Sequence, residues 1–141
     1  MIECNNSDIP EGFAFRPIVK SLAEDLAEKL PNASVVKAFN TMSQELFELA
    51  PDPLRNYGVS VFVAGDDERA RKTVMSLAEE IGFAPVDCGA LRNSRMIERV
   101  GDFIRFLMIG QNLGFYATIS VNTLPAPQEQ RLGGRQPSSL K

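Results

Sequence analysis

The stretch VVKAFNT, residues 35–41, decides how this sequence folds. It begins with small and β-branched apolar residues, and the run Ser34–Phe39 is too short to form a helix of its own. Both features are typical of a strand that is covered on both faces of a sheet. Because Asn40 and Thr41 follow at once, we expect this strand to end with amide and hydroxyl groups at its tip.

Outward from this stretch, strand patterns alternate with helix patterns along the chain. The expected strands are Met1–Cys4, Ser34–Phe39, Val59–Ala64 and Ala84–Cys88. The expected helices are Ser21–Leu30, Thr41–Leu49 (closed by Pro51 and Pro53), Glu68–Ile81 and Leu91–Ile109. Ser21 and Glu24 have the spacing of a capping box. This alternation favours an α/β fold with a mostly parallel sheet of about four strands and flanking helices.

The C-terminal part of the chain differs in composition from the rest. Residues 1–110 are expected to form the folded domain, although Gly101 is unfavourable inside its last helix. Residues 111–124 form a C-terminal extension in which Phe115–Val121 alternates weakly, like a further strand. Residues 125–141 are rich in Pro, Gln, Gly and Ser and are expected to form a flexible tail.

Composition narrows the function classes. The chain has 141 residues, a net charge of −3 and a pI near 5.0, which argues against a nucleic-acid partner. No apolar run is long enough to span a bilayer, and no secretory signal is visible, so a cytoplasmic location is expected. Cys4 and Cys88 show no metal-ligand spacing and are expected to be small buried residues in a reducing compartment. Histidine is absent, which removes the commonest general base and metal ligand, so we expect a cofactor to supply any chemistry.

Three strand tips carry polar residues: Asn5–Ser7, Phe39–Thr41 and Gly65–Asp67. In open parallel sheets ligands bind beyond the carboxyl ends of the strands, so these tips are expected to meet at one edge. An amide side chain there can exchange hydrogen bonds with a nicotinamide carboxamide or a ribose hydroxyl. The same residue types are also favoured in turns and at helix caps for purely structural reasons, and spacing does not separate the two interpretations.

Two longer blocks carry a family resemblance. SLAEDLAEKLPNASVVKAFNT and the later VFVAGDDERARKTVMSLAEEIGFAPVDCGALRNSRMIERV resemble the NADP-dependent oxidoreductase family that includes NADPH:deazaflavin (coenzyme F-420) oxidoreductase. The dinucleotide domain of STEAP-type metalloreductases is related to that family. The resemblance covers about Met1–Val100 and implies a Rossmann-like NAD(P)-binding fold.

The resemblance also implies which residues form the site. Asn6, Phe39, Asn40 and Thr41 correspond to residues that bind the NADP(H) cofactor. Ser94 and Arg95 open the last helix, where the family binds its acceptor, for which a flavin or a deazaflavin is expected. No side chain is expected to act as a catalytic acid or base, and no metal ligand is expected.

The family's glycine-rich phosphate loop is absent, because no G-x-G-x-x-G occurs in the sequence. The chain therefore resembles the C-terminal part of the family's Rossmann-like domain. Three interpretations stay open: an oxidoreductase that is truncated or completed by another chain, a non-catalytic half-Rossmann module, or an inactive fragment. The module would pair with itself as a homodimer or with a separate N-terminal half, because the edge of Met1–Cys4 lacks a neighbouring strand.

Overall fold

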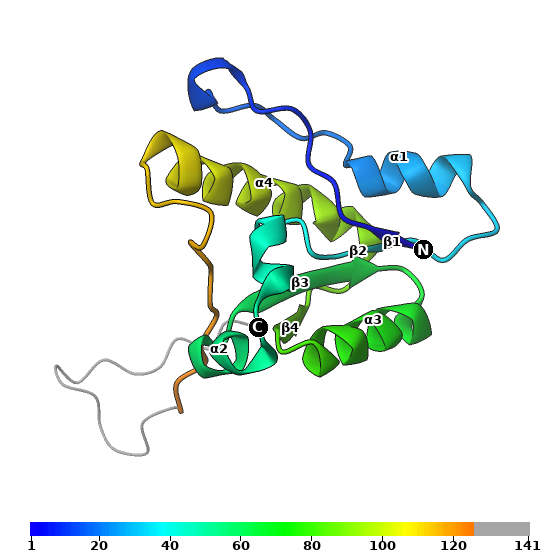
Figure 1. Ribbon diagram of the computed structural model, residues 1–141. Coiled ribbons are helices and arrows are strands. Elements are labelled where there is room, and N and C mark those ends of the chain that lie inside the picture. Colours follow the sequence, from blue (N-terminus) through cyan, green and yellow to red (C-terminus); the bar gives the residue numbers. More distant parts are fainter. Residues whose placement is uncertain (126–141) are drawn as a thin grey trace, which may run out of the picture.

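A computed structural model describes residues 1–125 and shows a four-stranded sheet with helices on both sides (Figure 1). The strands lie in the order β1 (Ile2–Glu3), β2 (Val36–Lys37), β3 (Ser60–Gly65), β4 (Ala84–Asp87). β1 pairs with β2 in parallel, and so does β3 with β4. The expected α/β fold with a mostly parallel sheet is thus confirmed.

The central pairing differs from the expectation. β2 and β3 are antiparallel, with Val36 opposite Gly65, so β3 and β4 run against the first two strands. The hydroxyl of Ser34, just before β2, accordingly donates to the Asp67 carboxylate just after β3, at 2.6 Å. The prediction that three strand tips meet at one edge is therefore wrong for Gly65–Asp67, which lies at the opposite edge.

In the described part of the chain, four α-helices flank the sheet, with α1 and α4 on one side and α2 and α3 on the other (Figure 1). Their bounds are α1 Leu22–Lys29, α2 Pro51–Tyr57, α3 Glu68–Glu80 and α4 Ser94–Arg105. Short 3₁₀ turns are η1 (Glu11–Phe13), η2 (Gln44–Glu48) and η3 (Leu91–Asn93), and α4 continues into a π-helical turn, η4 (Phe106–Gly110). Within residues 1–125, no helix is both long and apolar enough to cross a membrane.

The capping box at the start of α1 is confirmed. The Ser21 hydroxyl accepts from the backbone N–H of Glu24 at 3.1 Å, and the Glu24 carboxylate accepts from the backbone N–H of Ser21 at 2.8 Å. This reciprocal pair satisfies two N–H groups that the first turn of a helix leaves unbonded.

Two expected elements have other forms. The predicted helix Thr41–Leu49 is wrong, because the chain there forms only the 3₁₀ turn η2 before α2 begins at Pro51. Proline suits the first helical position, where its missing N–H costs nothing, so Pro51 starts a helix rather than ending one. The predicted strand Phe115–Val121 is also wrong, because this segment is irregular and offers the Ile119 carbonyl to the N–H of Ser60 at 2.9 Å. The tail predicted for residues 125–141 lies outside the described residues from 126 onward.

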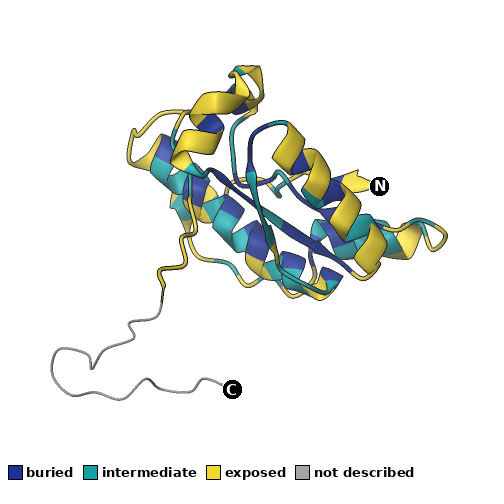
Figure 2. Ribbon diagram, turned by 90° about the horizontal axis from the view of Figure 1, so that it is seen from below, coloured by how far each residue is buried: buried dark blue, intermediate teal, exposed yellow. Residues whose placement is uncertain are grey.

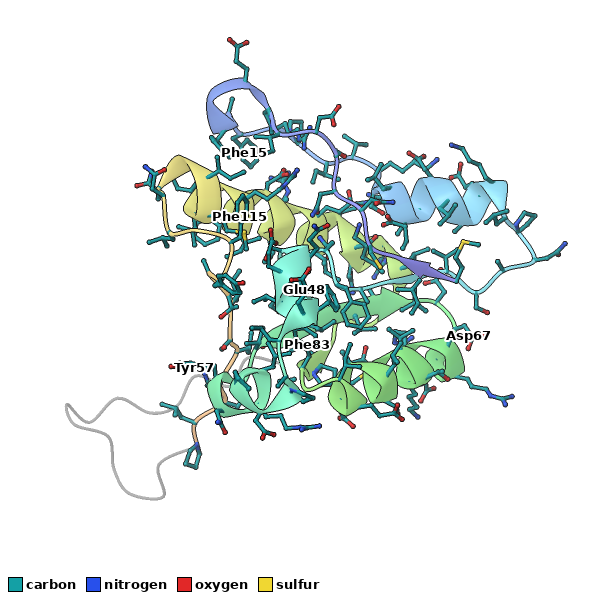
Figure 3. The ribbon with its side chains drawn as sticks, viewed as in Figure 1. Phe15, Glu48, Tyr57, Asp67, Phe83 and Phe115 are labelled. Atoms are coloured by element: carbon teal, nitrogen blue, oxygen red, sulfur yellow. The ribbon has the colours of Figure 1, made fainter. Side chains whose placement is uncertain are left out.

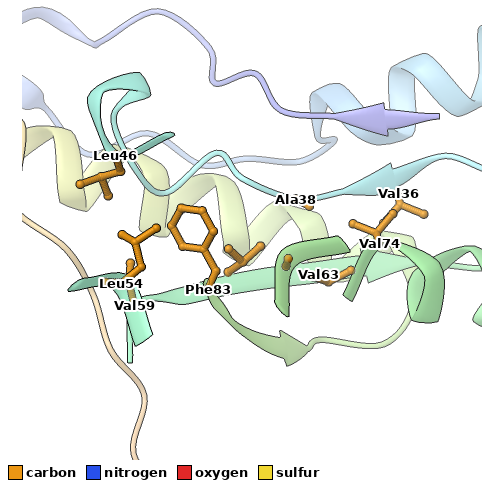
Figure 4. Close-up of a cluster of buried hydrophobic side chains, with 10 residues drawn as sticks. Val36, Ala38, Leu46, Leu54, Val59, Val63, Val74 and Phe83 are labelled. Atoms are coloured by element: carbon orange, nitrogen blue, oxygen red, sulfur yellow. The ribbon is translucent and has the colours of Figure 1, made fainter. Parts of the chain in front are cut away.

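Aliphatic side chains from β2, β3 and α3 form the main core together with Phe83 (Figure 4). Buried residues follow the strands and the inner faces of the helices, while the outer faces are exposed (Figure 2). Cys88 is half-buried, but Cys4 is exposed beside the two-residue strand β1, so the expectation that both cysteines are buried is wrong for Cys4.

Candidate functional site

Two asparagines meet where the parallel strands β1 and β2 end. Asn6 follows β1 and Asn40 follows β2, so the pairing of the strands brings them side by side. The Asn6 amide donates to the backbone carbonyl of Asn40 at 2.6 Å, and the Asn40 amide donates back to Asn6 Oδ1 at 2.9 Å. The two side chains thereby fix one another's orientation.

Helix α4 closes over this pair. The Asn40 amide also donates to the carbonyl of Ile97 at 3.2 Å. A Cβ at Gly101 would lie 2.2 Å from Asn6 Oδ1 and 2.9 Å from Asn40 Nδ2. Glycine at this position therefore lets the helix approach the asparagines, which explains a residue that is otherwise unfavourable in a helix.

One polar atom of the pair has no partner. Asn40 is 3% exposed, and among the described residues its Oδ1 is a buried acceptor without a donor. A buried unsatisfied polar atom costs about 1–3 kcal/mol, so it is retained where it has a use or meets a ligand.

A cavity of about 280 Å³ adjoins the pair. Its polar lining includes both asparagines and the start of η2, and its apolar lining comes from Met42 before η2, the end of α4, η4 and the segment that follows η4. The lining residues are Asn6, Asn40, Met42, Ser43, Gln44, Glu45, Ile104, Arg105, Met108, Ile109 and Phe115. A small pocket of this kind, with a few convergent polar groups, suits a single planar ring that carries an amide.

Phe39 and Thr41 do not line this cavity. Phe39 adopts a φ of 62°, a left-handed conformation that is unfavourable for a residue with a side chain. Its ring packs edge-on against Phe47 and Phe83, with centroids 5.7 and 6.1 Å away. Thr41 is buried. The structure thus brings Asn6 and Asn40 together, and the cofactor contacts of all four residues stay predictions.

Ser94 and Arg95 both contact the start of α1. Ser94 is fully buried, with its hydroxyl 2.6 Å from that of Ser21. Arg95 forms two hydrogen bonds of 2.7 Å with the Glu24 carboxylate, which lower the pKa of Glu24 to about 2. Neither residue lines the Asn6–Asn40 cavity, and their roles in acceptor binding stay predictions.

Sequence reasoning missed a buried charge cluster next to the site. Lys37, in β2, is fully buried and donates to the carboxylates of Glu3 at 2.6 Å and Glu98 at 3.0 Å. It also donates to the backbone carbonyl of Asn5, directly before Asn6. Burial raises the pKa of Glu98. A lysine inside an apolar strand was the available signal, since such a charge requires buried partners.

A second cavity, of about 360 Å³, lies between the N-terminal loop and α4. Its walls are mainly aromatic and basic: Ile9, Pro10, Phe13, Ala14, Phe15, Arg16, Arg99, Asp102, Phe103, Arg105 and Phe106. Phe15 lies on the loop above α4 (Figure 3), and the Arg99 guanidinium stacks on its ring at 4.5 Å. Arg105 lines both cavities and donates to the carbonyl of Ser7 at 2.8 Å. In residues 1–125, no group of three or more Cys, Asp or Glu side chains is placed to hold a metal ion.

Comparison with known proteins identifies homologues over part of the chain. No family model matches. Over 96 residues the chain is 34% identical to the F420-dependent NADP reductase of Methanocaldococcus jannaschii, a match that covers 67% of this chain and 40% of the relative. Over 81 residues it is 37% identical to Metalloreductase STEAP3 of Rattus norvegicus, covering 57% of this chain and 16% of the relative.

Comparison with solved structures points to the same family as the sequence comparison. A crystal structure of a putative F420-dependent NADP reductase from Arthrobacter sp. FB24 matches with a TM-score of 0.62 and 30% identity. The match covers 74% of this chain and 46% of that chain. The sheet and its helices therefore have the fold of part of an F420-dependent NADP reductase, and this chain spans less than half the length of each of these relatives.

Proposed function

We propose, from this homology, that the chain forms the nicotinamide-binding part of an NADP-dependent oxidoreductase. The Asn6–Asn40 cavity is the proposed place of the nicotinamide ring. The transfer partner is proposed to be a flavin or deazaflavin, as the name of the F420-dependent relative suggests. The free thiols of Cys4 and Cys88 suit the reducing cytoplasm that we propose as its location.

The unpartnered Oδ1 of Asn40 is the observation that carries this proposal. A nicotinamide carboxamide offers an NH₂ donor that this buried acceptor lacks. Because Asn40 Nδ2 is already held by Asn6 and Ile97, the orientation of the Oδ1 atom is set before any ligand arrives. A donor that meets it removes a desolvation cost already present in the folded chain.

The size of the cavity supports a ring rather than a whole dinucleotide. Its volume of about 280 Å³ is at the lower end of ligand pockets, which hold roughly 300–1,000 Å³. The sequence contains no G-x-G-x-x-G, the motif that binds pyrophosphate through backbone N–H groups at a helix N-terminus. We propose that residues outside these 141 bind the phosphates, either elsewhere in the same polypeptide or in a partner.

The chain's own residues then position and shield the ring. A bound NADP nicotinamide supplies or accepts a hydride, so no acid or base side chain is needed, in keeping with the absence of histidine. Asn40 fixes the carboxamide, Asn6 fixes Asn40, and the apolar walls from Met42, Ile104 and Met108 exclude water. Fixing the ring in this way is the main catalytic contribution that the site offers.

The second cavity is the proposed place of the acceptor. Its aromatic walls suit a flat ring system, and its arginines suit anionic groups on that ring system. It adjoins the nicotinamide cavity through Arg105, which lines both. Ser94, in contrast, is fully buried and lines neither of the two cavities, so an acceptor has no access to its side chain in this structure.

The test is calorimetric titration of the purified chain with nicotinamide mononucleotide, then with NADPH and NADH. Asn40→Ala should weaken binding about tenfold, the equivalent of one hydrogen bond at about 1.4 kcal/mol. Asn93→Ala is the matched control, because Asn93 also donates to a backbone carbonyl, that of Cys88 at 2.6 Å, but lines neither cavity. Equal affinities for the Asn40 variant and the wild type would remove Asn40 from the site.

A second candidate function is a non-catalytic half-Rossmann module. The observation that favours it is the edge of β1, which in residues 1–125 pairs only with β2. Ile2 on this strand is 37% exposed, and an open strand edge is a template for pairing with another strand. The proposed partners are a second copy or a separate N-terminal half. Sedimentation of the wild type and an Ile2→Pro variant tests self-pairing, since proline removes a donor from that strand and should convert any dimer to monomers.

A further inference from the structure

The segment after η4 is fixed beside the Asn6–Asn40 cavity by contacts at several points. The hydroxyl of Ser43 donates to the backbone carbonyl of Phe115. Further along, the N–H of Ser60 donates to the carbonyl of Ile119, and its hydroxyl accepts from the N–H of Val121, both at 2.9 Å. Residues 112–121 therefore follow one defined path from the end of α4 towards α2, drawn in orange in Figure 1.

The backbone of this segment is built to turn sharply. Asn112 and Gly114 have φ values of 56° and 82°, both in the left-handed region. A Cβ at Gly114 would meet nothing within 4 Å, so glycine is required there for its conformation and not for space. The turn brings Phe115 back to the cavity that Met108 and Ile109 already line.

Phe115 is an aromatic residue at the wall of the cavity, and it is not fully covered by the other described residues. The residue lines the cavity, and it is 53% exposed. Its backbone is held by Ser43, which lines the same cavity. An aromatic side chain with an uncovered face and a fixed backbone can stack on a planar ligand with little loss of side-chain freedom.

We propose that Phe115 stacks on the ring whose carboxamide Asn40 holds, and that it favours the oxidised form of that ring. This inference rests on the proposed function. The oxidised nicotinamide ring carries a positive charge, whereas the reduced ring is neutral. A cation is attracted to the face of an aromatic ring, so Phe115 favours the oxidised ring by about two- to fivefold at an exposed position such as this.

The absence of tryptophan from the sequence allows a direct test. Phe115→Trp introduces a single indole at the proposed contact, and Leu113→Trp introduces one on the same segment at a residue that is 62% exposed and does not line the cavity. The probe is oxidised nicotinamide mononucleotide, which needs no phosphate-binding loop for a dinucleotide. Stacking quenches indole fluorescence by charge transfer at ring contact, so we expect saturable quenching at position 115 and only weak, linear quenching at position 113.

A second variant keeps the test valid should Phe115→Trp fail to fold. Phe115→Leu retains the apolar wall but removes the aromatic face. NMR titrations with oxidised and reduced nicotinamide mononucleotide should show that this variant loses the two- to fivefold preference for the oxidised form, while Leu113→Ala keeps it.

The outcomes separate this inference from the proposed function. If the mononucleotide binds and Asn40→Ala weakens it, but position 115 is not quenched and Phe115→Leu keeps the preference, the role of Phe115 is wrong and the nicotinamide site stands. If the mononucleotide produces no shifts in the wild-type spectrum at millimolar concentration, the proposed nicotinamide site and the proposed role of Phe115 are both refuted.

Discussion

Adding a single methyl group in the middle of α4 should disrupt the paired asparagines. In Gly101→Ala the new Cβ would lie 2.2 Å from Asn6 Oδ1 and 2.9 Å from Asn40 Nδ2. Both distances are shorter than van der Waals contact, so the Asn6 side chain must move or the helix must shift. Moving Asn6 breaks its hydrogen bonds of 2.6 and 2.9 Å with Asn40.

Two opposing effects set the size of the change. Alanine is favoured over glycine inside a helix by about 1 kcal/mol. Overpacking costs about 1–3 kcal/mol, and hydrogen bonds that must be given up cost about 1 kcal/mol each. We therefore expect Gly101→Ala to lower the free energy of unfolding by about 1–3 kcal/mol, whereas the same exchange at an unobstructed helix position would raise it.

A double-mutant cycle with Asn6→Ala isolates the contact. Removing the Asn6 amide removes the atom at 2.2 Å and leaves only the contact of 2.9 Å with Asn40 Nδ2. The cost of that contact roughly offsets the gain of alanine over glycine in a helix, so Gly101→Ala should be nearly neutral in that background. The expected coupling is about 1–3 kcal/mol, measured by urea unfolding followed by circular dichroism, with equal m-values as the check for two-state behaviour. Effects that add within about 0.5 kcal/mol would refute the close approach of α4 to Asn6.

Two further predictions concern charged residues. Lys37→Met leaves Glu3 and Glu98 buried without their cation and should cost about 3–5 kcal/mol in urea unfolding at neutral pH; a small loss would contradict the buried cluster. The Arg95 hydrogen bonds lower the pKa of Glu24 from 4.5 to about 2, so the folded state binds fewer protons than the unfolded state, and the resulting stability is fully present above pH 4.5 and lost as the pH falls through about 2. Glu24→Gln should thus cost about 1 kcal/mol at pH 7 and almost nothing near pH 2, and an equal loss at both pH values would argue against the pair.

Local sequence signals predicted the parts of the fold that depend on neighbouring residues. The capping box at Ser21 and Glu24 needs only three residues of spacing, and it formed as expected. The run Ser34–Phe39 was expected to form a buried strand because its apolar residues fit no exposed element, and its middle, Val36–Lys37, forms β2 with both residues buried. Asn6 and Asn40 could be placed at one edge of the sheet because the strands before them were expected to be parallel, and β1 and β2 are parallel and also adjacent.

The rest depends on contacts between distant residues. The direction of β3 is set by how η2 and α2 return the chain to the sheet. The residue pattern within Ser60–Gly65 does not indicate that direction, because it is the same for a parallel and an antiparallel strand. Pro51 marks a helix start or a helix stop depending on which side of it the chain is helical. Ser94 and Arg95 contact the capping box of α1, more than seventy residues away along the chain, as the contacts with Ser21 and Glu24 show.

The buried charge cluster gives the clearest link between the fold and the site. Lys37 is on β2, and Asn40 follows it three residues later. The ammonium group of Lys37 donates to the carbonyl of Asn5, the residue before Asn6. One buried cation therefore holds the end of β1 against β2 at the place where the two asparagines must meet. Glu98, its partner on α4, lies one turn before Gly101, so the same contact sets how closely the helix approaches the pair. The cluster thus fixes the relative positions of the three elements on which the Asn6–Asn40 site is built, which is a use of buried ionic groups that does not depend on their net contribution to stability.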